Sequence, residues 1–294
     1  MTPLVSVMMP CYNATLTLPW ALASLVAQTY GHWECVLVDD ASTDDTKDLI
    51  DQLSDPRIKY VRSKNNKGRG AARQSALERS GGDFLCMLDA DDWMYPNRIE
   101  KQVHSLQNMK EIALVSSGMA VVDGCNQLMG VRGTSSSDQP EIAGPLNKQM
   151  KPGIAFPASM IRMEVARQVG FDPNQNGAED TDFLIRALHD NLYCKLPDVN
   201  YSYSELGGLQ INRIRQISRS RLYMLKKYKK DCFYQSFMAS METRFKLSLY
   251  TASYGIGLLP TVLKMRNRKA TDGELSDFLA AREQIGDTVR RAFS

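Results

Sequence analysis

Met87-Leu88-Asp89-Ala90-Asp91-Asp92 is an apolar run that ends abruptly in carboxylates. The stretch 83–88 follows the pair Gly81-Gly82, and a short apolar run after such a turn predicts a buried strand. Asp89 and Asp91 then stand two residues apart at the end of that strand. Extended backbone at this spacing lets both carboxylates lean toward one point, which suits a hard divalent cation that also binds phosphate oxygens. A solvated acidic turn is the alternative interpretation.

The first 120 residues alternate between predicted strands and predicted helices. Strands are predicted at 4–9, 35–38, 58–61, 84–88 and 112–117. Helices are predicted around 18–26 and at 43–53, 70–78 and 97–107. Ser42 or Thr43 is the expected cap of the second helix. This alternation predicts an α/β fold in which helices cover both faces of a mostly parallel sheet.

Three of these strands end in polar residues. Residues 10–13 follow the strand at 4–9, Asp39-Asp40 follow the strand at 35–38, and residues 89–92 follow the strand at 84–88. Ligands of parallel α/β sheets bind beyond the carboxyl ends of the strands. We therefore expect these three segments to form one binding site.

The chain changes character after residue 120. Residues 124–152, which include Ser135-Ser136-Ser137, are rich in Gly, Ser, Pro and Asn, and this composition predicts a loop or a mobile lid over the site. Regular structure is predicted to return at 154–161, with helices at 164–169 and 179–189 and a strand at 199–203.

Composition places the chain among ordinary soluble globular proteins. Of its 294 residues, 43% are hydrophobic and 23% are charged. The apolar start MTPLVSVMMP is too short for a signal peptide and lacks a basic leader, so we interpret it as the first strand. The six cysteines show no metal-type spacing, and several lie in apolar runs, which favours reduced thiols and a cytosolic compartment.

The net charge of +3 conceals a strong asymmetry. Residues 1–204 carry −6 and residues 271–294 carry −2, whereas residues 205–270 carry +11. Within that block, 213–230 holds eight cations and no acid, interleaved with Ile, Leu and Tyr. Such a helix suits an anionic membrane surface, and it equally suits a helix that docks on the rest of the protein with its basic face solvated. The segment does not resemble a nucleic-acid-binding module, so no nucleic acid partner is expected.

Five segments, taken in order, resemble the inverting nucleotide-sugar glycosyltransferases of family 2. They are VSVMMPCYNA (5–14), VLVDDASTDDT (36–46), NNKGRGAARQSAL (65–77), LDADD (88–92) and GAEDTDFLIRA (177–187). The resemblance covers roughly residues 4–205 and implies the GT-A fold, a Rossmann-like, mostly parallel central sheet flanked by helices. It implies a catalytic domain at 1–205, with a nucleotide-binding half at about 1–120 and an acceptor half at about 121–205. Residues 206–294 match no family pattern and are predicted to form a helical, basic C-terminal extension.

The resemblance assigns Pro10, Tyr12 and Asn13 to the loop that lies against the nucleoside. Tyr12 would stack on a base or flank it, and Pro10 would fix the backbone beside it. A turn that merely ends a strand is the alternative. Asp40 matches the family position that accepts the imide N–H of uracil, which would select uridine or thymidine. Alternatively, Asp40 only caps the following helix.

Residues 66–73 form a basic, Gly-containing turn that enters a predicted helix. Backbone N–H groups at a helix N-terminus, together with Lys67 and Arg73, would attract a diphosphate. The segment also reads G-x-G-x-x-R, close to a dinucleotide fingerprint. Arg73, however, stands where that fingerprint needs a third Gly, and the segment follows the third strand rather than the first. A Rossmann oxidoreductase is therefore disfavoured.

The resemblance makes Asp91 the direct ligand of Mn²⁺ or Mg²⁺ and puts Asp89 nearer the ribose or the sugar, still within the metal site. Asp92 would support these two residues from behind. The cation would bridge the diphosphate oxygens. Asp180 matches the general base of the family and lies in a first helical turn, where the helix dipole favours its ionised form. Glu179 is the alternative base.

The resemblance thus implies a metal-dependent, inverting hexosyl- or N-acetylhexosaminyltransferase whose donor is a nucleoside-diphosphate sugar, with uridine as the expected base. Together with the basic segment, it also implies an acceptor that is a saccharide or a lipid-linked saccharide in bacterial surface polysaccharide or glycolipid assembly. The expected place is the cytoplasm, including its membrane face. A nucleotidyltransferase is one alternative, although it would need a Gly-rich, basic loop where this chain has PCYN (10–13). A non-catalytic scaffold subunit is another, and Asp89, Asp91 and Asp180 argue against it.

Overall fold

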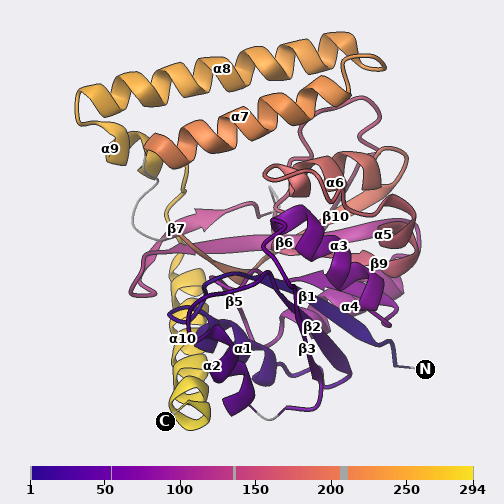
Figure 1. Ribbon diagram of the computed structural model, residues 1–294, viewed down its shortest axis with the longest axis vertical. Helices are drawn as coiled ribbons and strands as arrows, with labels where there is room; N and C mark the ends of the chain where they lie inside the picture. The colour runs from indigo at the N-terminus through magenta and orange to yellow at the C-terminus, as the bar shows by residue number, and fades with distance from the viewer. Residues whose placement is uncertain (1, 54, 135–136, 206–210, 294) are drawn as a thin grey trace.

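A computed structural model of the protein describes residues 2–53, 55–134, 137–205 and 211–293. In these residues a central mixed sheet carries helices on both of its faces (Figure 1). The strands are Val5–Cys11 (β1), Trp33–Asp39 (β2), Ile58–Arg62 (β3), Phe84–Met87 (β4), Trp93–Met94 (β5), Ile112–Val122 (β6), Leu128–Arg132 (β7), Glu141–Ala143 (β8), Ser159–Arg162 (β9) and Leu192–Ser204 (β10). The helices are Leu18–Val26 (α1), Thr46–Gln52 (α2), Arg69–Arg79 (α3), Arg98–Asn108 (α4), Met163–Val169 (α5), Glu179–Ala187 (α6), Ile211–Lys227 (α7), Phe233–Gly255 (α8), Leu259–Lys264 (α9) and Asp272–Ala292 (α10).

Each face of the sheet has its own hydrophobic core. Successive side chains of a strand point to opposite faces, and β1 shows this alternation. Val7 and Met9 pack in the cluster that α1 and α4 cover, whereas Met8 packs in the cluster that α3, α5 and α6 cover. All three side chains are buried. The predicted α/β arrangement, with the sheet enclosed between helices, is confirmed.

The strand order is β3-β2-β1-β4-β9-β6-β10-β5, with β7 paired to β6 and β8 paired to β10. Strands β3, β2, β1 and β4 are parallel to one another. Strand β9 is antiparallel to both of its neighbours, and β6 and β10 are again parallel. Because β1 lies between β2 and β4, the carboxyl ends of these three strands meet at one edge of the sheet. The fold therefore brings 10–13, 39–40 and 89–92 together, as the sequence predicts.

The second helix begins later than the sequence predicts. Helix α2 starts at Thr46, and neither Ser42 nor Thr43 caps it. These residues hold the loop after β1 instead: the Asn13 N–H donates to the Ser42 hydroxyl oxygen at 2.9 Å, and the Thr43 N–H donates to the Asn13 side-chain oxygen at 2.8 Å. Asp44 likewise accepts a hydrogen bond from the Thr15 N–H at 3.1 Å. The polar residues that the sequence predicts as the start of a helix therefore connect the loop after β1 to the segment after β2.

The middle of the chain contains strands where the sequence predicts a loop. The stretch predicted as a loop, 124–152, contains β7 and β8, which extend the sheet beside β6 and β10. Of the serine run at 135–137, the first two residues lie outside the described residues. The predicted strand at 199–203 is the last part of the longer β10, and the predicted helix at 179–189 ends at Ala187.

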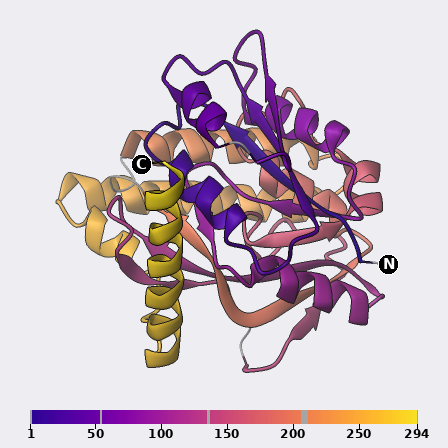
Figure 2. The same cartoon turned by 90° about the horizontal axis from the view of Figure 1, so that it is seen from below.

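The C-terminal helices form two separate groups (Figures 1 and 2). Helices α7 and α8 lie side by side above the sheet, and the short α9 follows them. Helix α10 returns to the body and packs on α1, where Phe278 and Ile285 share a buried cluster with Ala23 and Trp93. The predicted helical extension is confirmed, and because 206–210 lie outside the described residues, the predicted boundary at 205–206 stays a prediction.

Two further observations concern the cysteines and whether a helix could cross a membrane. All six cysteines are unpaired, and only Cys125 is exposed. Among the described residues, no helix combines the length and the apolar character needed to cross a membrane.

Candidate active site

A cleft of about 780 Å³ opens beyond the carboxyl ends of β1, β2 and β4. Its lining includes six residues that the sequence singles out: Pro10, Tyr12, Asn13, Asp40, Asp89 and Asp91. It also includes residues from α3, from the turn before α6, from β10 and from α7: Gly68, Arg69, Asn176, Tyr203, Arg213 and Gln216. The cleft is therefore closed on one side by the C-terminal extension.

Backbone hydrogen bonds continue the pairing of β1 with its neighbours into the segments that line the cleft. Cys11 pairs with Asp39 at the ends of β1 and β2, and the next N–H, that of Asp40, donates to the Cys11 carbonyl at 2.9 Å. On the other side of β1, the Leu88 N–H donates to the Met8 carbonyl at 3.1 Å. The first residues beyond each strand are thus fixed relative to one another before any ligand binds.

The loop after β1 presents Tyr12 to the cleft. The backbone of Asn13 has a positive φ of 49°, and its side chain and N–H are both engaged with the residues after β2. Asn13 is thereby committed to holding the loop. The Tyr12 ring is half exposed at the cleft wall, so its face remains accessible to a flat ligand.

Asp40 is buried and does not cap the following helix. Its carboxylate accepts the backbone N–H groups of Lys67, at 2.9 and 3.1 Å, and of Gly68, at 2.7 Å. Gly68 has a φ of +86°, a conformation that other residues rarely adopt, and this turn aims its N–H at Asp40. Two of the amides expected to attract a diphosphate are therefore bound to Asp40. The Lys67 side chain is exposed, and in the described part of this segment Gly68 and Arg69 line the cleft in its place.

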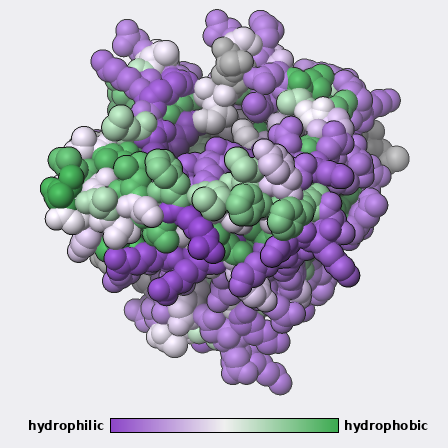
Figure 3. Space-filling model, turned by 90° about the horizontal axis from the view of Figure 1, so that it is seen from above, coloured by the Kyte–Doolittle hydropathy of each residue, from purple (hydrophilic) through white to green (hydrophobic). Residues whose placement is uncertain are grey.

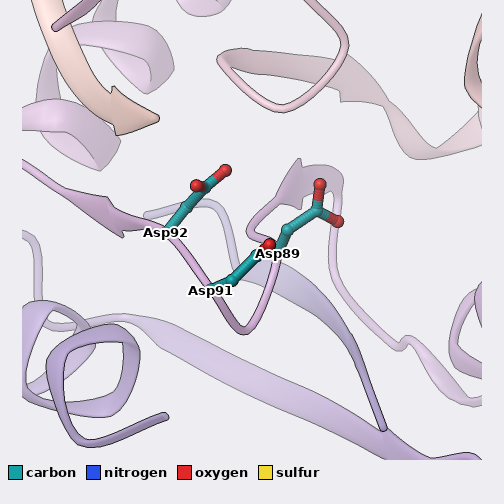
Figure 4. A group of neighbouring side chains, drawn as sticks. All are labelled: Asp89, Asp91 and Asp92. Atoms are coloured by element: carbon teal, nitrogen blue, oxygen red, sulfur yellow. The ribbon is translucent and has the colours of Figure 1, made fainter. Parts of the chain in front are cut away.

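The turn after β4 gathers three carboxylates (Figure 4). Asp89, Asp91 and Asp92 each offer an oxygen, and these oxygens lie within 4.8 Å of one another. Asp92 is buried, and both of its oxygens accept hydrogen bonds, one from the Tyr201 hydroxyl and one from the Ser204 N–H, each at 2.7 Å. Asp89 and Asp91 are left to face the cleft. The pair suits a hard cation with oxygen ligands.

Electrostatics at this turn favour a bound cation. Burial, and then the neighbouring Asp89, raise the pKa of Asp91 above its usual value. The cations Arg213 and Arg69 partly oppose this rise in the pKa of Asp91. Excess negative charge near Asp91 is the condition that a divalent ion would relieve, so the residues present fit such an ion.

Arg73 lies beneath the cleft rather than on its wall. Its guanidinium is almost fully buried, at 2% exposure, and donates to Asp89 at 2.8 Å and to Glu179 at 2.6 Å. The same group lies 4.7 Å from the centre of the Phe156 ring. Burial opposes its charge, but the carboxylates of Asp89, Glu179 and Asp180 together raise the pKa of Arg73. Arg73 thus joins the acidic turn after β4 to the start of α6.

Helix α6 presents its two first acids differently. Glu179 is buried and paired with Arg73 and, at 3.3 Å, with Arg69. Asp180 is partly exposed, and one of its oxygens accepts the N–H of Thr181 at 2.6 Å. It lies near enough to Arg73 to raise the pKa of that residue. Of the two, Asp180 is the carboxylate with access to solvent.

A glycine allows α6 to approach α3. A Cβ atom added to Gly70 would lie 2.5 Å from the carbonyl oxygens of Asp172 and Gln175, in the loop that leads to α6. Only glycine leaves room for that loop at this distance. Gly70 therefore allows the loop before α6 to lie against the start of α3.

Sequence reasoning missed two cations of the site. Arg69 lay within a quoted segment but was not selected, and Arg213 was assigned to the basic segment as a whole. The helical pattern around Arg213 contained no signal of a cleft, because the residues it faces, such as Asp91, lie more than a hundred positions earlier. The basic residues themselves were the only available hint.

The mostly parallel central sheet flanked by helices is the architecture of the GT-A fold. A family model described as glycosyl transferase family 2 matches residues 6–170, more than half of the chain. The chain belongs to that family.

Two curated relatives from Escherichia coli illustrate the likeness. The UDP-Glc:alpha-D-GlcNAc-diphosphoundecaprenol beta-1,3-glucosyltransferase WfgD is 35% identical over 127 residues, which are 43% of this chain and 49% of WfgD. WfaP, named with the same activity, is 36% identical over 107 residues, which are 36% of this chain and 43% of WfaP. The chain thus spans about half the length of the curated relatives it matches.

A solved structure extends the comparison to the whole chain. TarS of S. aureus, residues 1–349 in complex with UDP-GlcNAc, superposes with a TM-score of 0.62. The superposition covers 98% of this chain and 82% of that chain at 19% identity. At this identity the likeness shows the fold, and it includes the C-terminal helices.

Proposed function

We propose that this protein transfers a sugar from a uridine-diphosphate sugar to an acceptor hydroxyl, with inversion at the anomeric carbon. The observation that carries the proposal is the single cleft in which Asp40, the Asp89–Asp91 pair and two arginines meet. A base-selecting acid, a cation site and countercharges for a diphosphate are the parts that such a donor needs. Membership of glycosyl transferase family 2 supports the same reaction class.

The nucleoside end of the donor would lie between β1 and β2. Tyr12 offers an exposed ring face at the cleft wall, and Pro10 lies beside it. Asp40 accepts two backbone N–H groups and is acceptor-only when ionised, so it can take a further N–H from a uracil. Asn13 would act by holding this loop in place.

The diphosphate would lie between the acidic turn and the two arginines. Asp91, with Asp89, would hold Mn²⁺ or Mg²⁺, which when bound offsets the charge of the departing nucleoside diphosphate. Arg69 and Arg213 line the same cleft and are cations within electrostatic range of Asp91. Lys67 is exposed nearby and would add positive charge at the entrance. Arg73 would position Asp89 rather than contact the donor.

Asp180 would act as the general base. A positioned base takes the proton from the acceptor hydroxyl as its oxygen attacks the anomeric carbon from the face opposite the diphosphate. Single in-line displacement inverts that carbon. Asp180 is partly exposed, whereas Glu179 is buried and engaged with Arg73, and this contrast supports Asp180 over Glu179.

The names of the relatives support the choice of partners. WfgD and WfaP are named for a UDP-glucose donor and a diphosphoundecaprenol-linked acceptor, and TarS was solved with UDP-GlcNAc. We therefore propose a lipid-linked saccharide as the acceptor and surface polysaccharide or glycolipid assembly as the setting. The protein would work at the cytoplasmic face of an anionic membrane.

The test is calorimetric titration of UDP into the protein with Mn²⁺, with Mg²⁺ and with EDTA. Binding should require the cation and should be lost in Asp91→Ala. The loss should exceed the roughly 10- to 100-fold that removal of an outer partner of a metal ligand costs. Asp190→Ala, which removes a carboxylate that is 82% exposed, is the matched control and should bind UDP normally. Cation-dependent binding that survives in Asp91→Ala would refute the metal assignment, and tight donor binding without any transfer would favour a scaffold subunit.

A further inference from the structure

Helix α8 buries small or polar side chains and exposes large apolar ones. The residues that it buries against the protein are small or polar: Ser236, Ala239, Thr243 and Ser253. Most of its large apolar residues are exposed, and six of these lie on one side of the helix: Tyr234, Phe237, Met238, Met241, Phe245 and Leu249. Leu247 and Tyr250 are partly buried beside α7 and α9. Phe245 is 71% and Tyr234 is 68% exposed. A surface helix of a soluble protein normally shows the opposite arrangement.

The exposed apolar residues form one continuous band. Four of them follow one another at intervals of four residues from Phe237 to Leu249, which places them along one side of the helix. Ile256 and Leu258 continue the apolar surface beyond the end of α8. Figure 3, which looks onto α8 from above, shows hydrophobic side chains gathered along this helix. We call the six exposed apolar residues on this side of α8 (Tyr234, Phe237, Met238, Met241, Phe245 and Leu249) the α8 stripe. A patch of this kind marks an interaction surface.

Positive charge predominates beside the α8 stripe. On the helix, Arg244 lies to one side of it, and Lys246, which is paired with Glu242, lies to the other. Lys229 lies 5.8 Å from the centre of the Phe233 ring at the start of the helix. The block from 205 to 270 carries a net charge of +11. Lipid headgroups of negative charge complement such a surface, and apolar side chains between the cations suit the acyl region below the headgroups.

The same charge disfavours a second copy of this chain as the occupant. Two copies that met through the α8 stripe would bring Arg244 and Lys229 of each copy near the cations of the other. Like charges brought together at an interface oppose association. An anionic bilayer meets the stripe with the opposite sign of charge.

We propose that α8 lies flat in the interface of an anionic membrane, with the α8 stripe buried about 5–10 Å into the boundary between headgroups and acyl chains. The contact belongs to α8 rather than to the basic face of α7, on which the sequence prediction rested. Helix α7 is instead docked: Met224 and Leu225 pack on Ile185, and Lys227 is paired with Asp172.

The placement of α7 gives the membrane contact a consequence for the cleft. Helix α7 packs beside α8, and packed helices lie about 8–10 Å apart. Arg213 of α7 lines the cleft. The active site would therefore open one helix away from the bilayer, within reach of a sugar carried on a membrane lipid. This consequence rests on the proposed function, whereas the membrane contact itself does not.

The experiment is co-sedimentation of the full chain, without donor or acceptor, with vesicles of phosphatidylglycerol and phosphatidylcholine or of phosphatidylcholine alone. The stripe variant carries Phe237→Gln, Met241→Gln and Phe245→Gln. Wild type should pellet with the anionic vesicles. Because the burial of three large apolar side chains drives insertion, the stripe variant should lose binding roughly tenfold or more.

The matched control changes three other exposed apolar residues to Gln: Ile142, Leu275 and Leu279. This control should pellet like the wild type. A third variant, Lys229→Gln, Lys230→Gln and Arg244→Gln, should bind less at low salt and show a weaker dependence on salt, because attraction to the surface is screened beyond about 8 Å at physiological ionic strength.

Two results would overturn the proposal. One is a stripe variant that pellets like the wild type. The other is a wild type that ignores vesicles but sediments as a dimer, with the stripe variant as a monomer, which would make a second copy the occupant. The test is independent of catalysis: Asp91→Ala should keep vesicle binding, and the stripe variant should keep UDP binding.

Discussion

Helices α8 and α10 belong to the same C-terminal region and have 23 and 21 residues, yet α10 buries its aromatic side chain in the protein whereas α8 leaves most of its aromatic side chains exposed. Phe278 and Ile285 of α10 are buried, whereas α8 buries Ser236 and exposes Phe245. Thr271 caps α10 with a full capping box, and α8 has no side-chain cap. One helix therefore contributes a large aromatic side chain to the core of this protein, and the other leaves most of its large apolar side chains exposed.

The difference lies in what each helix meets. Phe278 finds an aromatic surface, since its ring centre lies 5.7 Å from that of Trp93, and Trp93 in turn lies 6.0 Å from Trp20 of α1. Helix α8 buries small side chains, and its Leu247 and Tyr250 are only partly buried beside Ile211 and Ile214 of α7. Its largest exposed rings therefore stay in water and add little to the hydrophobic stabilisation of the protein. The stability of the protein should therefore depend on α10 far more than on the outer face of α8.

The largest expected effect tests this contrast directly. Phe278→Ala should lower the free energy of unfolding by about 3–5 kcal/mol, because it leaves a cavity among packed aromatic rings. Phe245→Ala should change it by less than about 0.5 kcal/mol, since the ring is mostly in solvent. Urea unfolding followed by far-UV circular dichroism measures both variants against the wild type. Equal losses of stability would mean that the α8 stripe is covered by protein in solution.

The second largest expected effect concerns catalysis and does not depend on α8 or α10. Asp180→Asn should keep the affinity for UDP and lose sugar transfer by roughly a hundredfold or more, because the amide cannot accept the proton of the acceptor. A hundredfold loss corresponds to about 2.7 kcal/mol of transition-state stabilisation. Steady-state transfer to a soluble acceptor is the measurement, and the stripe variant of α8 should transfer at the wild-type rate. Near-normal transfer by Asp180→Asn would place the base elsewhere.

The catalytic half of the fold was largely predictable from local patterns. Apolar runs that end in acids marked β2 and β4, and their parallel pairing through β1 followed from the alternation of strands and helices. The cleft then follows, because parallel neighbours end at the same edge of the sheet. Tyr12, Asp40 and Asp91, which line the cleft, could be predicted to lie together because each stands in the segment that follows a strand.

The remaining features depend on contacts between distant parts of the chain. Arg73 looked like a ligand-binding cation, but Asp89 and Glu179 approach it from two other segments and hold it under the cleft. Periodicity showed that residues after 210 are helical without showing which side of a helix meets the protein. For α8 the usual rule, apolar side inward, would have given the wrong orientation.

The smallest expected effect concerns the start of α10. The Thr271 hydroxyl accepts the Glu274 N–H at 3.2 Å, and the Glu274 carboxylate accepts the Thr271 N–H at 2.8 Å and pairs with Arg268. Thr271→Ala should lower the free energy of unfolding by about 1 kcal/mol, and Thr271→Ser should retain most of it, since Ser caps as well as Thr. Hydrogen bonding from Arg268 lowers the pKa of Glu274, so this part of the stability is present above the usual Glu pKa and is lost as the pH falls through the lowered value. The deficit of Thr271→Ala in urea unfolding should therefore be larger at pH 7 than at pH 3. A deficit that does not change with pH would mean that the cap works without the carboxylate, and no deficit at all would mean that the packing of Phe278 alone holds α10 in place.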